Sequence, residues 1–119
     1  MTIQTVAVIA QGDMGSGTGG FLAHNGLRVI TSLTGRSQRS IDLAKGANME
    51  DVGDDGALFR EADVFLSILP PDQAVALTKQ MAPHIKASNK PIIYADCNAV
   101  APTTKEEIRD IVEPAGAHF

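Results

Sequence analysis

Short apolar runs recur along the chain, and segments of mixed polarity separate them. The runs lie at residues 5–10, 27–33, 63–69 and 91–96. The first and third are apolar at nearly every position rather than at alternate positions, which is typical of parallel strands buried on both faces. A shorter strand is expected near residues 48–52, and residues 118–119 look like the start of another one.

The segments between these runs have the periodicity and end signals of helices. We expect helices over residues 14–25 and 37–45, and Gly26 is a natural C-cap for the first. A third helix begins at Pro71, which suits a first helical turn. Four apolar residues at three-to-four spacing give it a buried face: Ala74, Leu77, Met81 and Ile85. Pro83 is expected to kink or terminate this helix, because proline lacks the N–H that the helix interior needs.

Strands and helices therefore alternate along the chain, and a last helix follows Pro102. Such alternation predicts an α/β fold of the Rossmann type: a doubly wound, mainly parallel sheet with helices on both faces. The 119 residues are expected to form one domain, residues 1–119, which is short for a complete two-domain enzyme. The abrupt end of the sequence leads us to expect a fragment of a longer chain or an isolated domain.

The turn after the first strand contains two glycines of the pattern G-x-G-x-x-G. Gly12 and Gly15 take the second and third glycine positions, and Ala10 stands at the first. A missing side chain at Gly12 lets the backbone approach a diphosphate, and Gly15 lets the following helix pack against the strand. The helix N-terminus then offers N–H groups to the phosphates. The alternative is an ordinary turn between strand and helix. The cofactor-binding residues predicted here are Ala10, Gln11, Gly12, Asp13, Met14 and Gly15.

The end of the second strand indicates which dinucleotide is bound. An NAD-dependent enzyme usually has Asp or Glu there to bind the ribose 2′-hydroxyl. This chain has no acidic residue between Asp13 and Asp42. It has instead Arg36, Ser37 and Arg39, with Thr34 before them, and a guanidinium suits a 2′-phosphate. We therefore predict NADP rather than NAD, the alternative being a solvated basic loop with Ser37 as an N-cap.

Composition excludes several other classes of protein. The formal net charge is −4 and aromatic residues make up 4%, which argues against nucleic-acid binding. No apolar run approaches the roughly 18–20 residues that cross a bilayer, and no signal peptide precedes the first strand. The single cysteine, Cys97, fits a reducing compartment, so we expect a cytoplasmic protein. Asp51, Asp54 and Asp55 lack the spacing of a calcium loop and are interpreted as a solvated turn.

Three blocks of the sequence together resemble the N-terminal half of the β-hydroxyacid dehydrogenases, which include 3-hydroxyisobutyrate and 6-phosphogluconate dehydrogenases. They are VIAQGDMG at residues 8–15, LSILP at 66–70 and DCNAVAP at 96–102. The resemblance implies that Leu69 and Pro70 lie beside the cofactor, and that the third block binds substrate. Asn98 and Ala99 stand where many members have Ser-Thr, so the substrate is not carried over. Asn98 is either a ligand of substrate or nicotinamide, or a turn residue.

The resemblance also implies a reaction: hydride transfer between NADP(H) and a small hydroxy acid or its keto or aldehyde partner. The catalytic lysine of this family would lie beyond Phe119, on a helical domain through which members form homodimers. No catalytic residue is therefore assigned. The four lysines of the second half are interpreted as solvated surface residues: Lys79, Lys86, Lys90 and Lys105.

Two other functions remain open at this point. The first is a non-catalytic module that binds or senses NADP(H). The second is a methyltransferase that uses S-adenosylmethionine, although that fold usually has an acid at the tip of the second strand, where this chain is basic.

Overall fold

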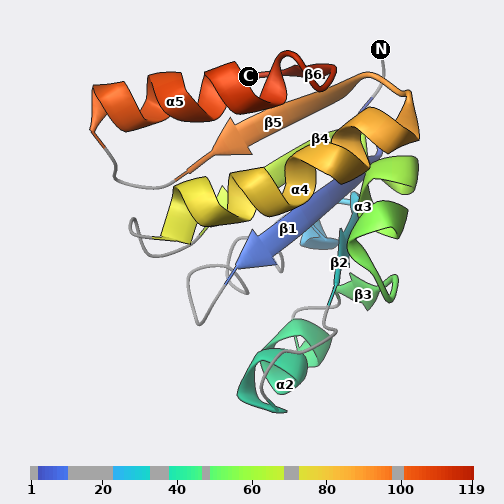
Figure 1. The fold of residues 1–119 in the computed structure, drawn as a ribbon. Coiled ribbons are helices and arrows are strands. Elements are labelled where there is room, and N and C mark those ends of the chain that lie inside the picture. The colour runs from blue at the N-terminus through green and yellow to red at the C-terminus, as the bar shows by residue number, and fades with distance from the viewer. Residues whose placement is uncertain (1–2, 11–22, 33–37, 47–48, 69–72, 98–100) are drawn as a thin grey trace.

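The computed structural model describes residues 3–10, 23–32, 38–46, 49–68, 73–97 and 101–119, and the account below concerns these residues. The strands are β1 Thr5–Ala10, β2 Arg28–Thr31, β3 Glu50–Asp51, β4 Val64–Ile68, β5 Ile92–Asp96 and β6 Ala117–His118. The helices are α2 Gln38–Gly46, α3 Asp55–Glu61, α4 Ala74–Ser88 and α5 Pro102–Val112. Figure 1 shows their arrangement.

The strands form one six-stranded sheet in the order β3-β2-β1-β4-β5-β6, and every pair of neighbours is parallel. The first strand lies in the middle, where β1 pairs with β2 on one side and β4 on the other. From β1 the chain builds outward to β3, then crosses over to β4 and builds outward in the opposite direction. The Rossmann-type α/β fold predicted from the alternation of strands and helices is confirmed.

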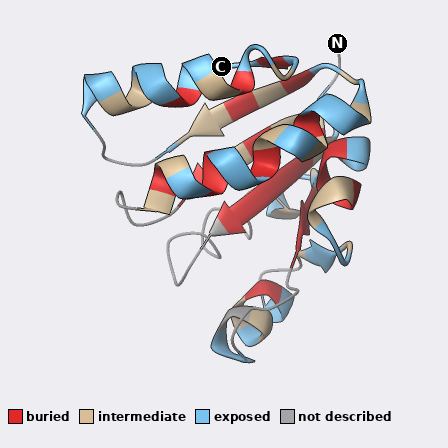
Figure 2. Ribbon diagram, in the orientation of Figure 1, coloured by how far each residue is buried: buried red, intermediate tan, exposed pale blue. Residues whose placement is uncertain are grey.

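One face of the sheet is covered by α3, α4 and α5 (Figures 1 and 2). Three aromatic rings form the centre of this layer, with Phe65 stacked 5.0 Å from Phe59 and 4.9 Å from Tyr94 between ring centroids. All four residues predicted to face the core from the helix after Pro71, which is α4, are buried: Ala74, Leu77, Met81 and Ile85. Stacked aromatic pairs stabilise such a core beyond the area that they bury.

The opposite face of the sheet has a smaller apolar cluster, formed by Val6, Val8, Val29 and Ile68. Alternate residues of β1 thus point to opposite faces, and both sets are buried. This explains why the first run lacks polar alternation, because a central parallel strand meets apolar neighbours on each side.

The expectation that Pro83 terminates its helix is wrong. Helix α4 continues through Pro83 to Ser88, and Asn89 follows with a left-handed backbone at φ 49°. A proline costs a helix the hydrogen bond to the carbonyl four residues earlier, here that of Lys79. Both Pro83 and Lys79 are exposed, so water reaches this side of the helix while the opposite face stays packed on the sheet.

The strand beginnings, which we call the amino edge, are joined by charged side chains. The Asp63 Oδ2 accepts the N–H groups of Gln4 at 3.0 Å and Thr5 at 3.1 Å, and these bonds hold the pKa of its carboxyl below the usual value. The guanidinium of Arg28 donates to both carboxylate oxygens of Glu50, at 3.0 and 2.9 Å, and to Glu61 at 2.9 Å. The pKa of Glu50 is lowered and that of Arg28 is raised, mainly by these hydrogen bonds.

Within the described part of the chain, no helix has both the length and the apolar character needed to cross a membrane.

Candidate functional site

The carboxyl edge of the sheet, where the strands end, contains a point at which the direction of strand addition reverses. Strands β1 and β4 end side by side there, with Ala10 opposite Ile68 in the register. From β1 the chain continues to one side, whereas from β4 it continues to the other. Ligands of open parallel sheets bind at such a point, because the connections diverge there and leave a crevice.

The structure places Ala10 as the last residue of β1, at this point. Arg39, the other arginine suggested for a 2′-phosphate, is the second residue of α2 and is exposed. The remaining sequence-predicted site residues lie outside the described residues and stay predictions: Gln11, Gly12, Asp13, Met14, Gly15, Thr34, Arg36, Ser37, Leu69, Pro70, Asn98 and Ala99. Each of these four groups begins within three residues of the carboxyl end of β1, β2, β4 or β5. The fold therefore brings the starting points of all four groups to one edge.

The described end of β2 bears on the cofactor. It consists of Thr31 and Ser32, which are both buried, and the Ser32 hydroxyl donates to the Gly53 carbonyl at 3.4 Å. A carboxylate that binds a ribose 2′-hydroxyl usually lies at this strand end, and neither residue is acidic. Asp51, opposite Thr31 in the register of β3, accepts the N–H of Gly53 at 2.9 Å. The described end of β2 therefore offers no carboxylate to a ribose 2′-hydroxyl, which is compatible with the predicted NADP.

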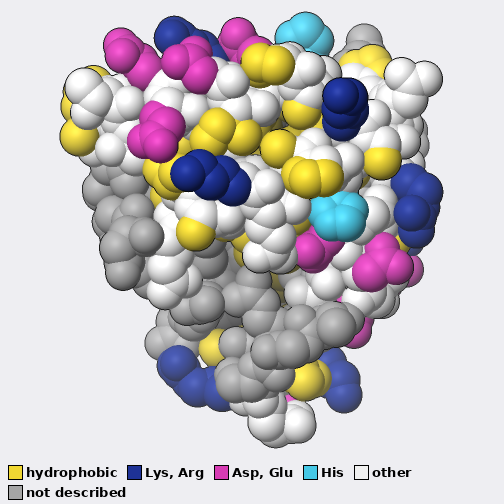
Figure 3. Space-filling model, viewed as in Figure 1, with side chains coloured by type: hydrophobic (Ala, Val, Ile, Leu, Met, Phe, Trp, Pro, Cys, Tyr) yellow, Lys and Arg dark blue, Asp and Glu magenta, His cyan; other side chains and the backbone are white. Residues whose placement is uncertain are grey.

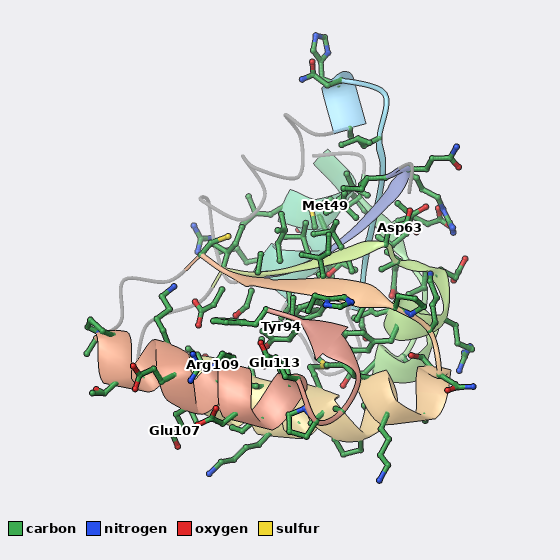
Figure 4. All side chains as sticks on the ribbon, turned by 90° about the horizontal axis from the view of Figure 1, so that it is seen from above. Met49, Asp63, Tyr94, Glu107, Arg109 and Glu113 are labelled. Carbon is green, nitrogen blue, oxygen red and sulfur yellow. The ribbon has the colours of Figure 1, made fainter. Side chains whose placement is uncertain are left out.

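A network of buried hydroxyl groups lies between the sheet and α4, where Tyr94 of β5 meets Thr78 of α4. Tyr94 is labelled in Figure 4. The Thr78 hydroxyl donates its single proton to the Ala74 carbonyl at 2.8 Å, so the Tyr94 hydroxyl, 3.0 Å away, must donate to Thr78. Ser67 of β4 also bonds to Tyr94. Burial raises the pKa of Tyr94 to about 12. The network therefore stays neutral and fixes the first turn of α4 against the ends of β4 and β5.

An ion pair between a buried carboxylate and a partly exposed lysine lies at the end of β5. The Lys105 ammonium of α5 donates to the Asp96 main-chain carbonyl at 2.7 Å and lies 3.6 Å from its Oδ1. The Asp96 side chain is only 1% exposed, and that of Lys105 is 34% exposed. The interpretation of Lys105 as a solvated surface lysine is wrong. The sequence contained a signal for this contact. β5 ends at Asp96 and α5 begins six residues later, so the end of the strand and the start of the helix both lie at the carboxyl edge.

Cys97 follows Asp96 and is exposed. Its N–H donates to the Ser67 carbonyl at 3.0 Å, which extends the pairing of β4 and β5. Partial desolvation and the neighbouring Asp96 carboxylate raise the pKa of the Cys97 thiol, although Lys105 acts in the opposite direction. A thiol with a raised pKa is a poor nucleophile at neutral pH, so Cys97 gives no support to covalent chemistry at this edge.

Of the three aspartates interpreted as a solvated turn, only Asp54 lies in the turn, whereas Asp51 ends β3 and Asp55 begins α3. The Asp54 Oδ1 accepts the Ala57 N–H at 2.8 Å and caps α3. Asp55 is the first residue of that helix, and its Oδ2 accepts a hydrogen bond from Gln80. The described residues hold no group of three or more His, Cys, Asp or Glu that is arranged to bind a metal ion.

Comparison with known proteins gives the family. Residues 1–108 match the family model of the acetohydroxy acid isomeroreductase NADPH-binding domain. The chain belongs to this family. Because the match covers most of the chain, the domain is an NAD(P)-binding domain of an oxidoreductase family, which agrees with the predicted class.

Several individual proteins are similar to parts or all of the chain. An uncharacterized 28.5 kDa protein of Methanothermus fervidus is 28% identical over 87 residues, which make up 73% of this chain and 33% of that protein. A conserved protein of unknown function, whose structure is reported to resemble 3-hydroxyacid dehydrogenases, is 24% identical with a TM-score of 0.79, over 92% of this chain and 40% of that one. The 3-hydroxyisobutyrate dehydrogenase of Mycobacterium tuberculosis, studied with L-serine, is 18% identical with a TM-score of 0.79, over 98% and 39%.

These likenesses confirm the predicted resemblance. The chain is an NAD(P)-binding domain by its family model, and the dehydrogenase structures share its fold. The chain spans only about a third to two fifths of the length of these relatives.

Proposed function

We propose that this chain is the cofactor-binding domain of an NADP-dependent oxidoreductase, which transfers a hydride between NADP(H) and a small hydroxy acid or its keto or aldehyde partner. The observation that carries the proposal is the meeting of β1 and β4 at the reversal point of the sheet. A ligand crevice is expected there, in a domain whose family is NADPH-binding.

In this proposal the residues of the chain bind and orient the cofactor. Residues 10–15 hold the diphosphate through backbone N–H groups and a helix N-terminus. Arg36 and Ser37 hold the 2′-phosphate, with Thr34 beside them. Leu69, Pro70 and Asn98 lie toward the nicotinamide, and Asn98 with Ala99 faces the substrate. The bound nicotinamide supplies the hydride chemistry.

The preference for NADP depends on Arg36, and its replacement is the direct test. Charge-assisted hydrogen bonds of a guanidinium to a phosphate contribute about 1.5–3 kcal/mol. Arg36→Gln should therefore weaken NADPH binding by roughly 10- to 100-fold and leave NADH binding nearly unchanged. Fluorescence titration or calorimetry with both cofactors measures this difference.

Arg60→Gln is the matched control, because it removes a cation of α3 that is exposed and only 3.9 Å from Asp54 in a surface pair. It should change neither affinity. Equal losses for NADPH and NADH in Arg36→Gln contradict the NADP preference. A wild-type chain that does not bind NADPH at millimolar concentration contradicts the cofactor-binding function itself.

A non-catalytic NADP(H)-binding or sensing module is the alternative, and one observation favours keeping it. Among the described groups of the carboxyl edge, Asp96 and Tyr94 are buried in bonded networks, so neither is placed to exchange a proton with a substrate. Turnover of hydroxy acids by the whole protein supports the enzyme, and binding without turnover supports the module. The methyltransferase alternative is tested separately, by comparing the thermal shifts that NADP, NAD and S-adenosylmethionine produce.

The hydroxy-acid substrate, a homodimer formed through a further domain and a cytoplasmic location stay predictions from the sequence. The same holds for the absence of nucleic-acid and membrane partners.

A further inference from the structure

The ion pair of Asp96 and Lys105 has a position that suggests more than a structural role. Asp96 is the last residue of β5, so its carboxylate lies at the carboxyl edge, and this side chain is almost completely buried. A charge buried near a binding crevice is screened by water much less than an exposed one. Whatever neutralises this carboxylate therefore affects how the edge receives an anionic ligand.

The surrounding sequence provides few cations for this task. Lys105 is the only Lys or Arg between Lys90 and Arg109, whereas Asp96, Glu106 and Glu107 all lie in that interval. Acidic side chains also gather on the surface over α5, along the top of Figure 3. Removing Lys105 would make an already acidic end of the molecule more negative.

The location of Lys105 in its helix is unfavourable without such a partner. It is in the first turns of α5, which has no acidic residue in its first turn. A cation there opposes the helix dipole, whose positive end is the N-terminus. The bond to the Asp96 carbonyl and the nearby carboxylate compensate for this cost.

We propose that Lys105 is a positioning residue that neutralises the Asp96 carboxylate at the carboxyl edge, and so allows this edge to accept the negatively charged NADPH. The inference rests on the proposed function, because it concerns how the same site admits its cofactor. Lys105 acts through Asp96 and makes no contact with the cofactor.

The test compares variants of the whole chain by NADPH titration at low and high salt. Lys105→Met should weaken binding about 10-fold at low salt, an estimate for one added unscreened charge near the site. The loss should shrink at high salt, where repulsion is screened. The double variant Asp96→Asn/Lys105→Met should bind within about 3-fold of wild type, since the charge that repels the cofactor is gone.

Three further variants complete the experiment. Lys105→Arg keeps the charge and should bind like the wild type. Asp96→Asn alone keeps the cation and should bind as tightly or more tightly, which tests the inference even if Lys105→Met fails to fold. Lys86→Met is the control for loss of one positive charge, because Lys86 is exposed in the last turn of α4, toward the amino edge.

Each outcome decides between the possibilities. Wild-type affinity in Lys105→Met overturns the inference while leaving the proposed function intact. A double variant as weak as Lys105→Met also overturns it, because Lys105 would then contact the cofactor or serve only the fold. A wild-type chain that does not bind NADPH at all overturns the proposed function and this inference together.

Discussion

The two edges of the sheet use polar side chains in opposite ways. At the amino edge, Asp63 and Arg28 form hydrogen bonds and ion pairs at the surface, between segments far apart in the chain. At the carboxyl edge, Tyr94 and Asp96 have buried side chains, bonded to Thr78 and Lys105. The first arrangement joins strand beginnings, whereas the second supports the strand ends at which a ligand is expected.

The difference also predicts opposite responses to pH. The amino edge depends on a carboxylate with a lowered pKa, and the carboxyl edge on a phenol with a raised pKa. Acid should therefore weaken the amino edge first, and alkali the carboxyl edge. The following variants test this contrast, from the largest expected effect to the smallest.

Tyr94→Phe should reduce the free energy of unfolding by about 2 kcal/mol, because it removes the hydroxyl to which the buried Thr78 and Ser67 side chains bond. Burial raises the native pKa of Tyr94 from 10.0 to about 12. Its contribution is thus complete below pH 10 and is lost as the pH rises toward 12. Urea unfolding at neutral and alkaline pH measures both effects, and the variant should lack this alkaline loss.

The matched control is the double variant Tyr94→Phe/Thr78→Val, which removes both partners. Its stability should exceed the value expected from adding the two single losses, because fewer polar groups are left buried without partners. Additive losses would show that the hydroxyl pair does not act as a unit.

Asp63→Ala should cost about 1 kcal/mol, since two N–H groups at a partly exposed site lose their acceptor. The native pKa of Asp63 is lowered, so its contribution is complete above the unfolded pKa of about 4 and is lost as the pH falls through the native value. The stability difference between wild type and variant should therefore narrow in acid. NADPH affinity should be unchanged, and a large loss of affinity would contradict the separation of the two edges.

Arg28→Met should have the smallest effect, although Arg28 makes three hydrogen bonds to Glu50 and Glu61, which lie far from it in the sequence. All three side chains are exposed, and exposed ion pairs contribute little. Thermal unfolding should show a small decrease in Tm that becomes smaller at high salt. A loss greater than that of Asp63→Ala would contradict this ranking.

Much of the fold could be predicted from local patterns. The strands at residues 5–10, 63–69 and 91–96 were recognisable because central parallel strands need apolar side chains on both faces. Gly26 was recognisable as a helix end, and it has a positive φ of 86°. Pro83 does not terminate its helix, because packing of Met81 and Ile85 on the sheet retains the helix despite one missing N–H.

The polar contacts of the carboxyl edge were harder to predict. Ser67, Thr78 and Tyr94 come from three elements, and nothing in their local sequence marks them as partners. Lys105 resembles other lysines of amphipathic helices until α5 is placed beside the end of β5. Such contacts depend on how elements pack, which short-range periodicity does not specify.

The sequence by itself determined the alternation of strands and helices, the dinucleotide-binding class and the absence of an acid after the second strand, because these follow from local composition and spacing. Only the tertiary structure decided which polar side chains meet. It buried Asp96 against Lys105 and Tyr94 against Thr78, since parallel pairing of β4 and β5 brings distant segments to one edge, and burial then requires each polar group to find a partner.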